Sequence, residues 1–452
     1  MVPVGDEYKN LVSTNIRYPC KPTIVVGGVE ENGNVIRIEF KASQIKELQF
    51  TYGIDPLSRE LPYIELTWTE VLDGKLDENG NIFKYANVKE HMFVDLYFEQ
   101  DLAPYNSWRL LYEENKTWLQ LFYTKKTWKN LKKEVLKQTI RFPRVFLVDK
   151  PKAEGNTIKW TARDALYFCT LNQNFWVNFD LFSQEYKNKY IIPIRELLRR
   201  EANTITDDND QLKIYLNSTI NFLMNNEKVN GIEHNGIISF YGKTSDLLRK
   251  YMSVSGNVFM SFPSPDRVME AGYVSFDIAP SVDEFINTNG SLKKLYVNSM
   301  YKQPVLNRQS GVGSYQATIY NVVFGEKGDL PETSQERTHK AEKGSVYELT
   351  SNYCHLDTFV EDNDLQVNDN GVELRFAEIR RFIYPNSVIA ECEILHDLSI
   401  EPSDFVEFET GVYKKGQNGD LEKVAYNGMV VKNSIKYNGA IRQSITINSV
   451  EY

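Results

Sequence analysis

The sequence predicts a mainly β protein with a mixed α/β middle region. Apolar and polar residues alternate in many short stretches, and this period of two is typical of half-buried strands. Aromatic residues, which favour strands, make up 13% of the 452 residues. Asn-Gly, the strongest short hairpin signal because both residues tolerate positive φ, occurs at Asn32-Gly33, Asn79-Gly80, Asn230-Gly231, Asn235-Gly236, Asn289-Gly290, Asn370-Gly371, Asn418-Gly419, Asn427-Gly428 and Asn438-Gly439.

The first region, residues 1–170, is predicted to contain six or more strands and so to form a β-barrel-like domain or a sandwich. Val35–Phe40 shows the clearest alternation, and a turn at Glu154-Gly155-Asn156 leads into a strand at Thr157–Ala162. The other predicted strands are Leu48–Tyr52, Ile64–Thr69, Phe93–Phe98 and Val145–Val148.

The middle region, residues 171–290, is predicted to be α/β. Pro193 opens a helix that runs to Ala202, with Ile194, Leu197, Leu198 and Ala202 on one face. Thr244 or Ser245 can cap a second helix that Gly256 ends. A hairpin then joins Val258–Phe262 to Tyr273–Ile278.

The third region, residues 291–452, is predicted to be a closing β-barrel-like domain. No repeat of the first region is visible residue by residue. Two polar segments, Gly325–Lys343 and Glu361–Gly371, interrupt it and are predicted to be exposed excursions. The predicted strands are Leu295–Val297, Ala317–Val323, Val388–Ile394, Phe405–Phe408, Val430–Tyr437 and Ser444–Ile447.

Composition excludes several classes of protein. With 52 basic and 61 acidic residues the net charge is −9, which disfavours broad nucleic-acid binding. The N-terminus has no apolar stretch typical of a signal peptide, and no apolar run is long enough to span a membrane. Four scattered cysteines, Cys20, Cys169, Cys354 and Cys392, predict a reducing compartment and no disulfide scaffold.

No catalytic, cofactor or metal-binding residues are predicted, and the chain is not expected to be an enzyme. HExxH, GxSxG and paired CxxC motifs are all absent. Cys354, His355, Cys392 and His396 have poor zinc spacing, and Cys392 is more simply a core residue; whether the four meet in space stays open. Gly242-Lys243-Thr244 has the wrong register for a phosphate loop and is interpreted as a strand end entering a helix.

Most of the charged segments are predicted to be exposed to solvent. The acidic pairs Asp207-Asp208 and Asp362/Asp364 lie in polar stretches and are predicted to be solvent-exposed. Lys125–Lys137, a basic run around Trp128, Leu131 and Val135, is a candidate amphipathic helix. A solvated helix packed on the β domain is favoured, while a contact with an acidic partner or a membrane surface stays open.

Several short sequence segments, taken in order, resemble segments of the phage tail hub family. This family includes the baseplate hub of contractile tails and the tail-associated protein of siphophages. Ile54–Pro62 before the strand ending Trp68-Thr69 is similar to the turn in the family's first domain. Arg141-Phe142-Pro143 followed by Ile158–Tyr167 resembles the end of that domain. The helices and hairpin of the middle region, and the closing strands from Val406 to Ile447, complete the resemblance.

This resemblance implies a virion structural protein of the tail tip, assembled in the bacterial cytoplasm. In the family, two β-barrel-like tube domains per chain form a trimeric, pseudo-six-fold ring, which adapts a six-fold tail tube to a three-fold tip and lets DNA pass. The implied partners are two further copies of the chain, distal tail or tail tube proteins, the tape measure protein, and central tip or fibre proteins. DNA is expected only in transit, through an acidic or neutral lumen, and stable membrane insertion is not expected.

Two other function classes stay open. A carbohydrate-binding receptor adhesin of the virion would also be β-rich and aromatic. A cell-wall-cleaving enzyme would need a cleft with converging carboxylates or a Cys–His pair. The polar excursion Gly325–Lys343 is expected to be mobile in the free protein and to pack on a partner in an assembly.

Overall fold

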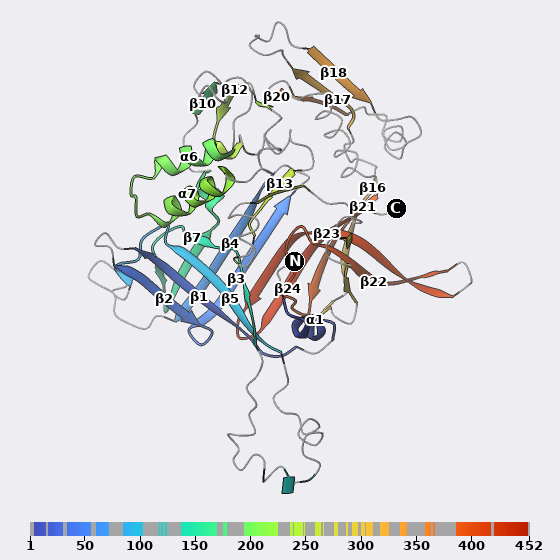
Figure 1. Ribbon diagram of the computed structural model, residues 1–452. Helices are drawn as coiled ribbons and strands as arrows, with labels where there is room; N and C mark the ends of the chain where they lie inside the picture. The colour runs from blue at the N-terminus through green and yellow to red at the C-terminus, as the bar shows by residue number, and fades with distance from the viewer. Residues whose placement is uncertain are drawn as a thin grey trace.

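The structure is a computed structural model of the 452-residue chain (Figure 1). The described residues are 4–14, 17–29, 34–55, 60–71, 85–102, 117, 119–120, 123, 137–169, 175–178, 194–224, 236–237, 239–246, 248, 258–263, 265, 275–278, 286–287, 292–296, 300–302, 304–310, 317–324, 335–340, 358–362, 365–366, 386–416 and 420–450.

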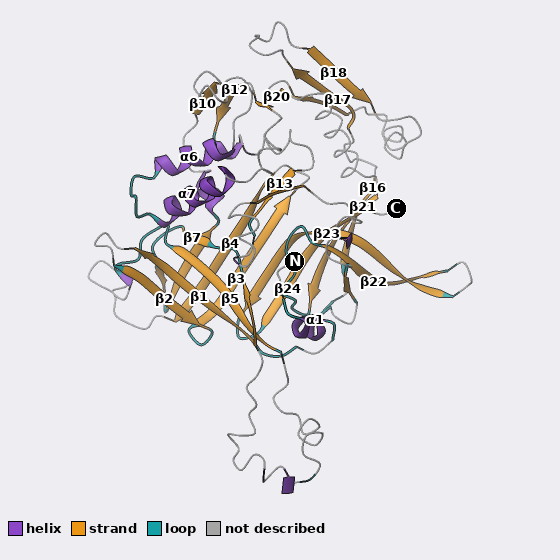
Figure 2. Ribbon diagram, in the orientation of Figure 1, coloured by secondary structure: helices purple, strands orange, loops and turns teal. Residues whose placement is uncertain are grey.

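One large sheet dominates the described part of the chain (Figure 2). Its 15 strands come from both ends of the sequence, and its ladders are antiparallel except where β15 pairs with β22. From the first region come β1 Cys20–Val29, β2 Val35–Lys41, β3 Ile45–Asp55, β4 Glu60–Val71, β5 Phe93–Asp101, β6 Lys137–Arg141, β7 Val145–Leu147, β8 Lys152–Glu154 and β9 Thr157–Arg163. From the third come β15 Lys293–Leu295, β16 Val305–Ser310, β21 Asn386–Ile394, β22 Phe405–Lys415, β23 Leu421–Tyr437 and β24 Ile441–Val450.

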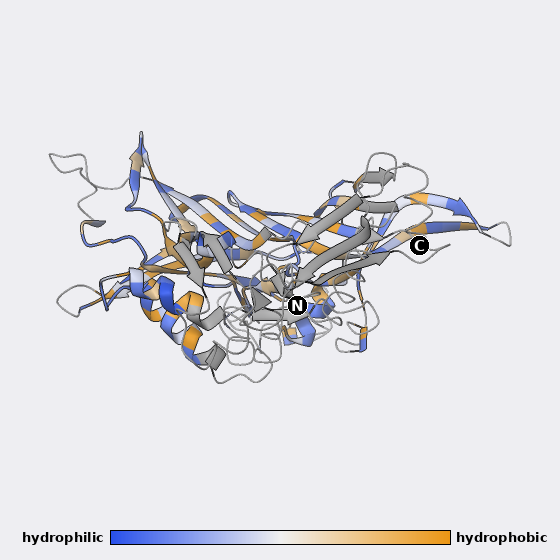
Figure 3. Ribbon diagram, turned by 90° about the horizontal axis from the view of Figure 1, so that it is seen from above, coloured by the Kyte–Doolittle hydropathy of each residue, from blue (hydrophilic) through white to orange (hydrophobic). Residues whose placement is uncertain are grey.

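The remaining elements are short. Seen from above, the helices lie on one side of the large sheet, whose strands alternate hydrophilic and hydrophobic residues (Figure 3). Among the described residues the helices include α1 Asp6–Val12, α4 Ala165–Cys169, α6 Ile194–Thr204 and α7 Gln211–Met224. The small sheets contain β10 Phe175–Asn178, β11 Gly236–Ile237, β12 Ser239–Gly242, β13 Val258–Ser261, β14 Ser275–Ile278, β17 Ala317–Phe324, β18 Gln335–Lys340, β19 Thr358–Asp362 and β20 Leu365–Gln366.

Five strands of the first region and five of the third have the same order in space. In the first region the hydrogen-bonded order is β3-β4-β9-β7-β5, and in the third it is β16-β21-β24-β23-β22. Numbered along the chain, both read first, second, fifth, fourth, third. Every neighbouring pair in both sets is antiparallel. We call these sets the N-terminal block and the C-terminal block.

The correspondence extends to the residues that face the core. Ile64, Leu66 and Trp68 of β4 match Ala390, Cys392 and Ile394 of β21, and each of the six is at most 1% exposed. Their cross-strand partners match in turn. Trp160 lies opposite Trp68, Gln443 lies opposite Ile394, Tyr52 lies opposite Ile64, and Leu306 lies opposite Ala390.

Two hydrophobic clusters fill the blocks, and Ile435, Tyr437 and Ile441 of the C-terminal block belong to the cluster of the N-terminal block. In the N-terminal block the Trp68 and Trp160 rings stack at 5.2 Å, and Phe40 and Tyr85 pack edge-on against them. The core of the C-terminal block is mostly aliphatic, with Phe408 as its one fully buried aromatic among the described residues. Burial of these faces in both blocks accounts for the alternating pattern of the sequence.

Most of the predicted strands are confirmed, as are the helix that begins at Ile194 and the hairpin of β13 and β14. The prediction missed β1, whose buried run Thr23–Val26 does not alternate, and the helix α7. Asn438-Gly439 forms the predicted turn, with Gly439 at φ +95°. Asn427-Gly428 does not: it lies inside β23, where a Cβ on Gly428 would approach the backbone of Asn448 to 2.7 Å.

The two predicted excursions are partly strand. Gln335–Lys340 forms β18, and Thr358–Asp362 with Leu365–Gln366 forms β19 and β20. β18 and β19 pair with the two edges of β17, where backbone hydrogen bonds hold polar strands that have no apolar pattern. The sequence did not predict these strands, and residues 325–334, 341–343, 363–364 and 367–371 lie outside the described residues.

Candidate functional site: the joint between the two blocks

The two blocks are joined by a strand pairing between β3 and the second half of β23. Six residue pairs form this antiparallel ladder, from Lys432 opposite Gly53 to Tyr437 opposite Leu48. On the outer face the Thr51 and Ser434 hydroxyls are hydrogen-bonded at 3.2 Å. On the inner face Phe50 and Ile435 are buried opposite each other. The joint therefore makes one sheet out of two blocks that lie at opposite ends of the chain.

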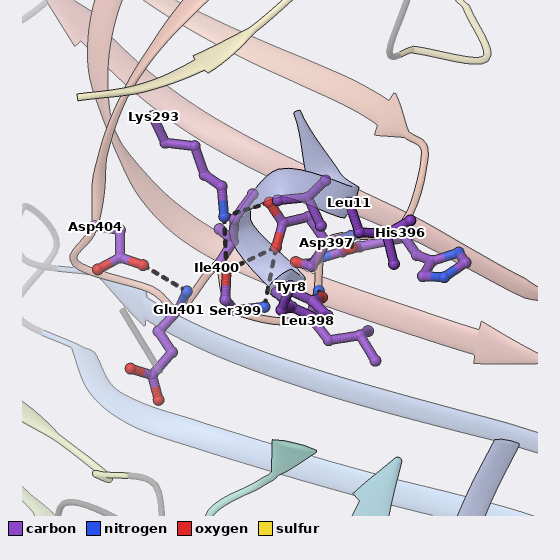
Figure 4. A network of polar contacts seen from close by, with 12 residues as sticks. Tyr8, Leu11, Lys293, His396, Asp397, Leu398, Ser399, Ile400, Glu401 and Asp404 are labelled. Carbon is purple, nitrogen blue, oxygen red and sulfur yellow. Dashed lines mark hydrogen bonds and ion pairs between the residues drawn. The ribbon is translucent and has the colours of Figure 1, made fainter. Parts of the chain in front are cut away.

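A buried polar network lies beside this joint and includes the segment between β21 and β22, residues 395–404 (Figure 4). Helix α1 contributes the Tyr8 hydroxyl, which accepts a hydrogen bond from the Leu398 backbone N–H at 2.8 Å. Burial, with the nearby Asp397 charge, raises the pKa of Tyr8 well above its ordinary value. Arg17 donates to the His396 carbonyl at 2.9 Å and also to carbonyls at the end of α1.

His396 connects the network to the first region. Its Nε2 lies 2.8 Å from the Gln100 side-chain oxygen, and the Gln100 amide donates to the carbonyls of Tyr18 and Asp101. Burial, reinforced by the Arg17 charge, lowers the pKa of His396 to about 4. The ring is therefore neutral at neutral pH.

Asp397 is the charged centre of the network. Lys293 forms an ion pair with it and also donates to the Ser399 hydroxyl at 2.6 Å. Burial alone would raise the pKa of Asp397, but the Lys293 ammonium and the Ser399 hydrogen bonds outweigh burial and hold the pKa below its ordinary value. Both side chains are largely shielded, with exposures of 17% for Lys293 and 5% for Asp397.

Two strand residues complete the network. Gln443 accepts from the Asp397 N–H at 2.6 Å and donates to the Asp397 carbonyl and to Asn433. Asn433, in the ladder of the joint, donates to the Ile400 carbonyl at 2.8 Å. Ser403 adopts a positive φ of 81° and its N–H bonds the Val430 carbonyl. Residues 395–404 are thus fixed to α1, β15, β23 and β24 by directional contacts.

Sequence reasoning did not find this network, although two positions carried a signal. Gln443 alternates in phase with Ile441, Ile445 and Ile447, so a polar side chain occupies an inward position of an otherwise apolar strand face. Asn433 is likewise in phase with Ile435 and Tyr437. A buried polar residue of this kind requires a partner. Nothing local to the sequence identified that partner as residues 397–400.

A separate groove of about 710 Å³ lies over β1, β2, β5 and β6. Three arginines line it, together with apolar residues from α7 and from the segment after β13. Arg144 makes two hydrogen bonds of 2.7 Å to Asp95 and lies 4.3 Å from the centre of the Phe93 ring. With Arg37 and Arg141 also in the lining, the groove can receive an anionic group.

The zinc ligand set considered from the sequence is not assembled among the described residues. Cys392 is 1% exposed within the C-terminal core, as the simpler interpretation predicts, and burial raises its pKa to about 12. His396 is hydrogen-bonded to Gln100 instead. Cys354 and His355 lie outside the described residues. In the part of the chain that is described, no cluster of three or more His, Cys, Asp or Glu side chains could hold a metal ion.

The other sequence candidates have plain structural roles where they are described. Gly242 ends β12 and Thr244 is buried in the following helical turn, as the interpretation of a strand end entering a helix predicts. Asp207 and Asp208 are exposed; Asp208 pairs with Lys213 at 2.7 Å, and this contact lowers its pKa. Asp362 ends β19, and Asp364 is not among the described residues.

The basic run Lys125–Lys137 is corrected at its end. Lys137 begins strand β6, where its ammonium lies 3.0 Å from the Glu99 carboxylate, rather than ending a helix. Residues 124–136 lie outside the described residues. No helix in the described stretches is both long and apolar enough to cross a membrane.

No family model and no curated protein matches this sequence. Solved structures of tail proteins do match, as the sequence resemblance predicts. The 43 kDa tail protein of prophage MuSo2 from Shewanella oneidensis is 9% identical with a TM-score of 0.42, over 95% of this chain and 98% of that chain. A tail protein from Neisseria meningitidis MC58 is 8% identical with a TM-score of 0.45, over 95% and 96%. The Francisella PdpA-VgrG complex matches at 11% identity and a TM-score of 0.44, over 97% of this chain and 55% of that one.

Proposed function

We propose that this chain is a structural hub of a phage tail tip, a homotrimer that adapts a six-fold tail tube to a three-fold tip and lets DNA pass. The observation that carries the proposal is the shared strand order of the two blocks. Two similar blocks per chain and three chains per ring provide six similar positions. Such a ring presents near-six-fold symmetry to a tube and true three-fold symmetry to a tip.

The joint supports this role mechanically. The β3–β23 ladder fixes one block to the other, and the network around Asp397 holds the connecting residues 395–404 in place. A rigid connection is what a ring under load requires, because a flexible linker would let the six positions move independently. Hydrogen-bonded buried polar groups give directional rigidity of this kind.

The proposal includes a set of partners. Tail tube or distal tail proteins would contact the six-fold face, central tip or fibre proteins would contact the three-fold face, and the tape measure protein would enter the lumen. DNA passes through in transit, and the net charge of −9 per chain is consistent with a lumen that does not retain phosphate. The protein would be assembled in the bacterial cytoplasm and reside in the virion.

Imaging of assembled particles tests the proposal directly. A three-fold ring with a central hole, in which the two blocks of each chain alternate around the axis, is the expected result. Two-fold pairing, or a ring in which the blocks do not occupy similar positions, would contradict it. A lumen lined mainly by Lys and Arg would contradict the passage of DNA without retention.

Activity assays separate the hub from the other classes. Purified protein incubated with host cell walls should release no soluble fragments, and an immobilised glycan panel should not retain it. Fragment release that is lost on substitution of His355 or Asp364 would instead indicate a cell-wall-cleaving enzyme. Retention on one glycan would indicate a receptor adhesin.

A further inference from the structure

β8 and β16 are among the strands of the large sheet that have an edge no described strand covers. β8 pairs only with β9, and all three of its residues are exposed. β16 pairs only with β21 and ends the order of the sheet, with Val305 58% exposed. Uncovered edges present backbone N–H and C=O groups to any strand that can align with them.

The shared strand order identifies the counterparts of these edges. The β8–β9 hairpin turns at Gly155, and the β23–β24 hairpin turns at Gly439; both glycines have positive φ and both hairpins lead into the fifth strand of a block. In β23 the residues before that turn, 432–437, carry β3 on their outer edge. The edge of β8 is therefore the counterpart of an edge that is already occupied within the chain.

The strand that occupies this edge of β23, β3, has a counterpart in the C-terminal block as well. β3 is the first strand of the N-terminal block, and β16 is the first strand of the C-terminal block. One chain thus contains one completed joint, β3 with β23, and both halves of a second joint, β16 and β8. In Figure 1, β16 and β7, the strand that precedes β8 in the sequence, lie on opposite sides of the molecule.

We propose that β16 of one copy pairs antiparallel with the segment 148–153, which includes β8, of a second copy of the same chain. The contact repeats between chains the joint that β3 and β23 make within a chain. This inference rests on the proposed hub, but it names the contact and not the number of copies. A head-to-tail contact of this kind forms a ring when the rotation between copies closes, and an open filament when it does not.

Corresponding cross-strand pairs in the two blocks set the register of the proposed contact. Tyr52 matches Leu306, because their partners Ile64 and Ala390 match, so Thr51 matches Val305. Tyr437 matches Ala153, because they pair with the matching residues Ile441 and Ile158, so Ser434 matches Lys150. Since Thr51 and Ser434 lie opposite each other in the known joint, Val305 of one copy lies opposite Lys150 of the next.

Charges around both edges fit a specific and reversible contact. Lys152 pairs with Asp149 at 2.8 Å beside one edge, and Lys302 pairs with Glu393 at 3.3 Å beside the other. Short strands and nearby charges protect an edge from unspecific pairing. The contact therefore needs the additional area of correctly oriented neighbours, and a dilute chain is expected to remain monomeric.

Cysteine cross-linking of the full-length chain tests the contact. Val305→Cys combined with Lys150→Cys should give covalent multimers on non-reducing gels at high protein concentration, on treatment with a short thiol-specific cross-linker. The matched control is Thr51→Cys with Ser434→Cys, which should cross-link within one chain and give no multimers. Each single variant reports any background from the native cysteines.

A second cysteine pair tests whether the register of the proposed contact is shifted by two residues. Val305→Cys should also react with Lys152→Cys, more weakly, and should not react with Lys415→Cys, which lies on the β22–β23 hairpin. Multimers no more abundant than in the single variants, for both Lys150 and Lys152, would overturn the inference. This outcome alongside a trimeric particle would leave the proposed function intact. Efficient cross-linking in particles with a copy number other than three would support the proposed contact between chains but contradict the proposed trimeric hub.

Discussion

The two blocks have one strand order and two kinds of interior. Trp160 and Gln443 occupy corresponding positions opposite the corresponding residues Trp68 and Ile394. In the N-terminal block the position holds an indole stacked on its neighbour at 5.2 Å. In the C-terminal block it holds an amide that bonds the backbone of Asp397. The order of strands is thus independent of the chemistry at this position.

The difference shows what each interior does. The aromatic cluster of the N-terminal block stabilises by area removed from water, which is not directional. The amide of the C-terminal block fixes a neighbouring segment through directional hydrogen bonds, which are costly if left unmade. Residues 395–404, which must hold a defined position beside the joint, are contacted by the block that buries an amide in its interior.

The largest expected effect is in the aromatic cluster. Trp160→Ala should lower the free energy of unfolding by about 4 kcal/mol, because it removes a buried ring and leaves a cavity. Ile445→Val, which trims the C-terminal core, should cost only about 1 kcal/mol. Denaturant titration measures both values. Equal losses for the two variants would show that the blocks do not differ in how they are stabilised.

The buried ion pair should be the next most sensitive feature. Lys293→Met leaves the Asp397 carboxylate buried without its cation and should cost about 3 kcal/mol. The neighbouring Lys294, paired with Glu407 on the surface at 3.4 Å, is the control, and Lys294→Met should change stability by less than about 0.5 kcal/mol. Equal effects in thermal or chemical unfolding would mean that Asp397 is solvated.

Acid should weaken the C-terminal side through His396. Its folded pKa of about 4 lies below the ordinary value of 6.5, so the unfolded chain binds the proton first as the pH falls. This residue's contribution is fully present above about pH 6.5 and is lost progressively toward pH 4, by up to about 3 kcal/mol. His396→Gln should show a smaller loss of stability over that range.

A second titrating group, Asp164, also changes stability over this pH range, so the pH profile of His396→Gln must be compared with that of the wild type. Burial raises the pKa of Asp164 to about 6, so its contribution changes with the opposite sign, favouring the folded state as the pH falls from about 6 toward 3.8. This term is common to wild type and to His396→Gln, and it cancels in the difference between their pH profiles. Parallel profiles for the two proteins would exclude His396 as a source of acid sensitivity.

The smallest effect should come from the residue that distinguishes the blocks. Gln443→Leu introduces an apolar side chain of similar size but leaves the Asp397 N–H and carbonyl and the Asn433 amide oxygen short of a partner, at a cost of about 2 kcal/mol. Hydrogen exchange should increase at residues 397–400 and stay unchanged around Trp160. If Gln443→Leu left the free energy of unfolding unchanged, the Gln443 amide would be dispensable for stability, unlike the Trp160 indole.

The sequence predicted the elements better than their arrangement. Alternation located strands such as Val35–Lys41 because one face of each is buried, whereas Thr23–Val26 was missed because both faces are. The repeated strand order could not be detected by comparing residues, since corresponding positions hold residues as different as Trp160 and Gln443. The network was invisible too, because its contacts, such as that between His396 and Gln100, span 296 residues. Local patterns do not encode such pairings.

The β3–β23 joint has a consequence for the way the chain is made. Thr51 and Ser434 are 383 residues apart, so β3 leaves the ribosome roughly 20 to 80 s before its partner at synthesis rates of 5–20 residues per second. During that interval the outer edge of β3 is open to any other nascent chain. A message truncated before codon 432 would release a product with this edge permanently exposed. Full-length synthesis therefore acts as the step that closes the sheet, and incomplete chains are expected to aggregate rather than enter the assembly.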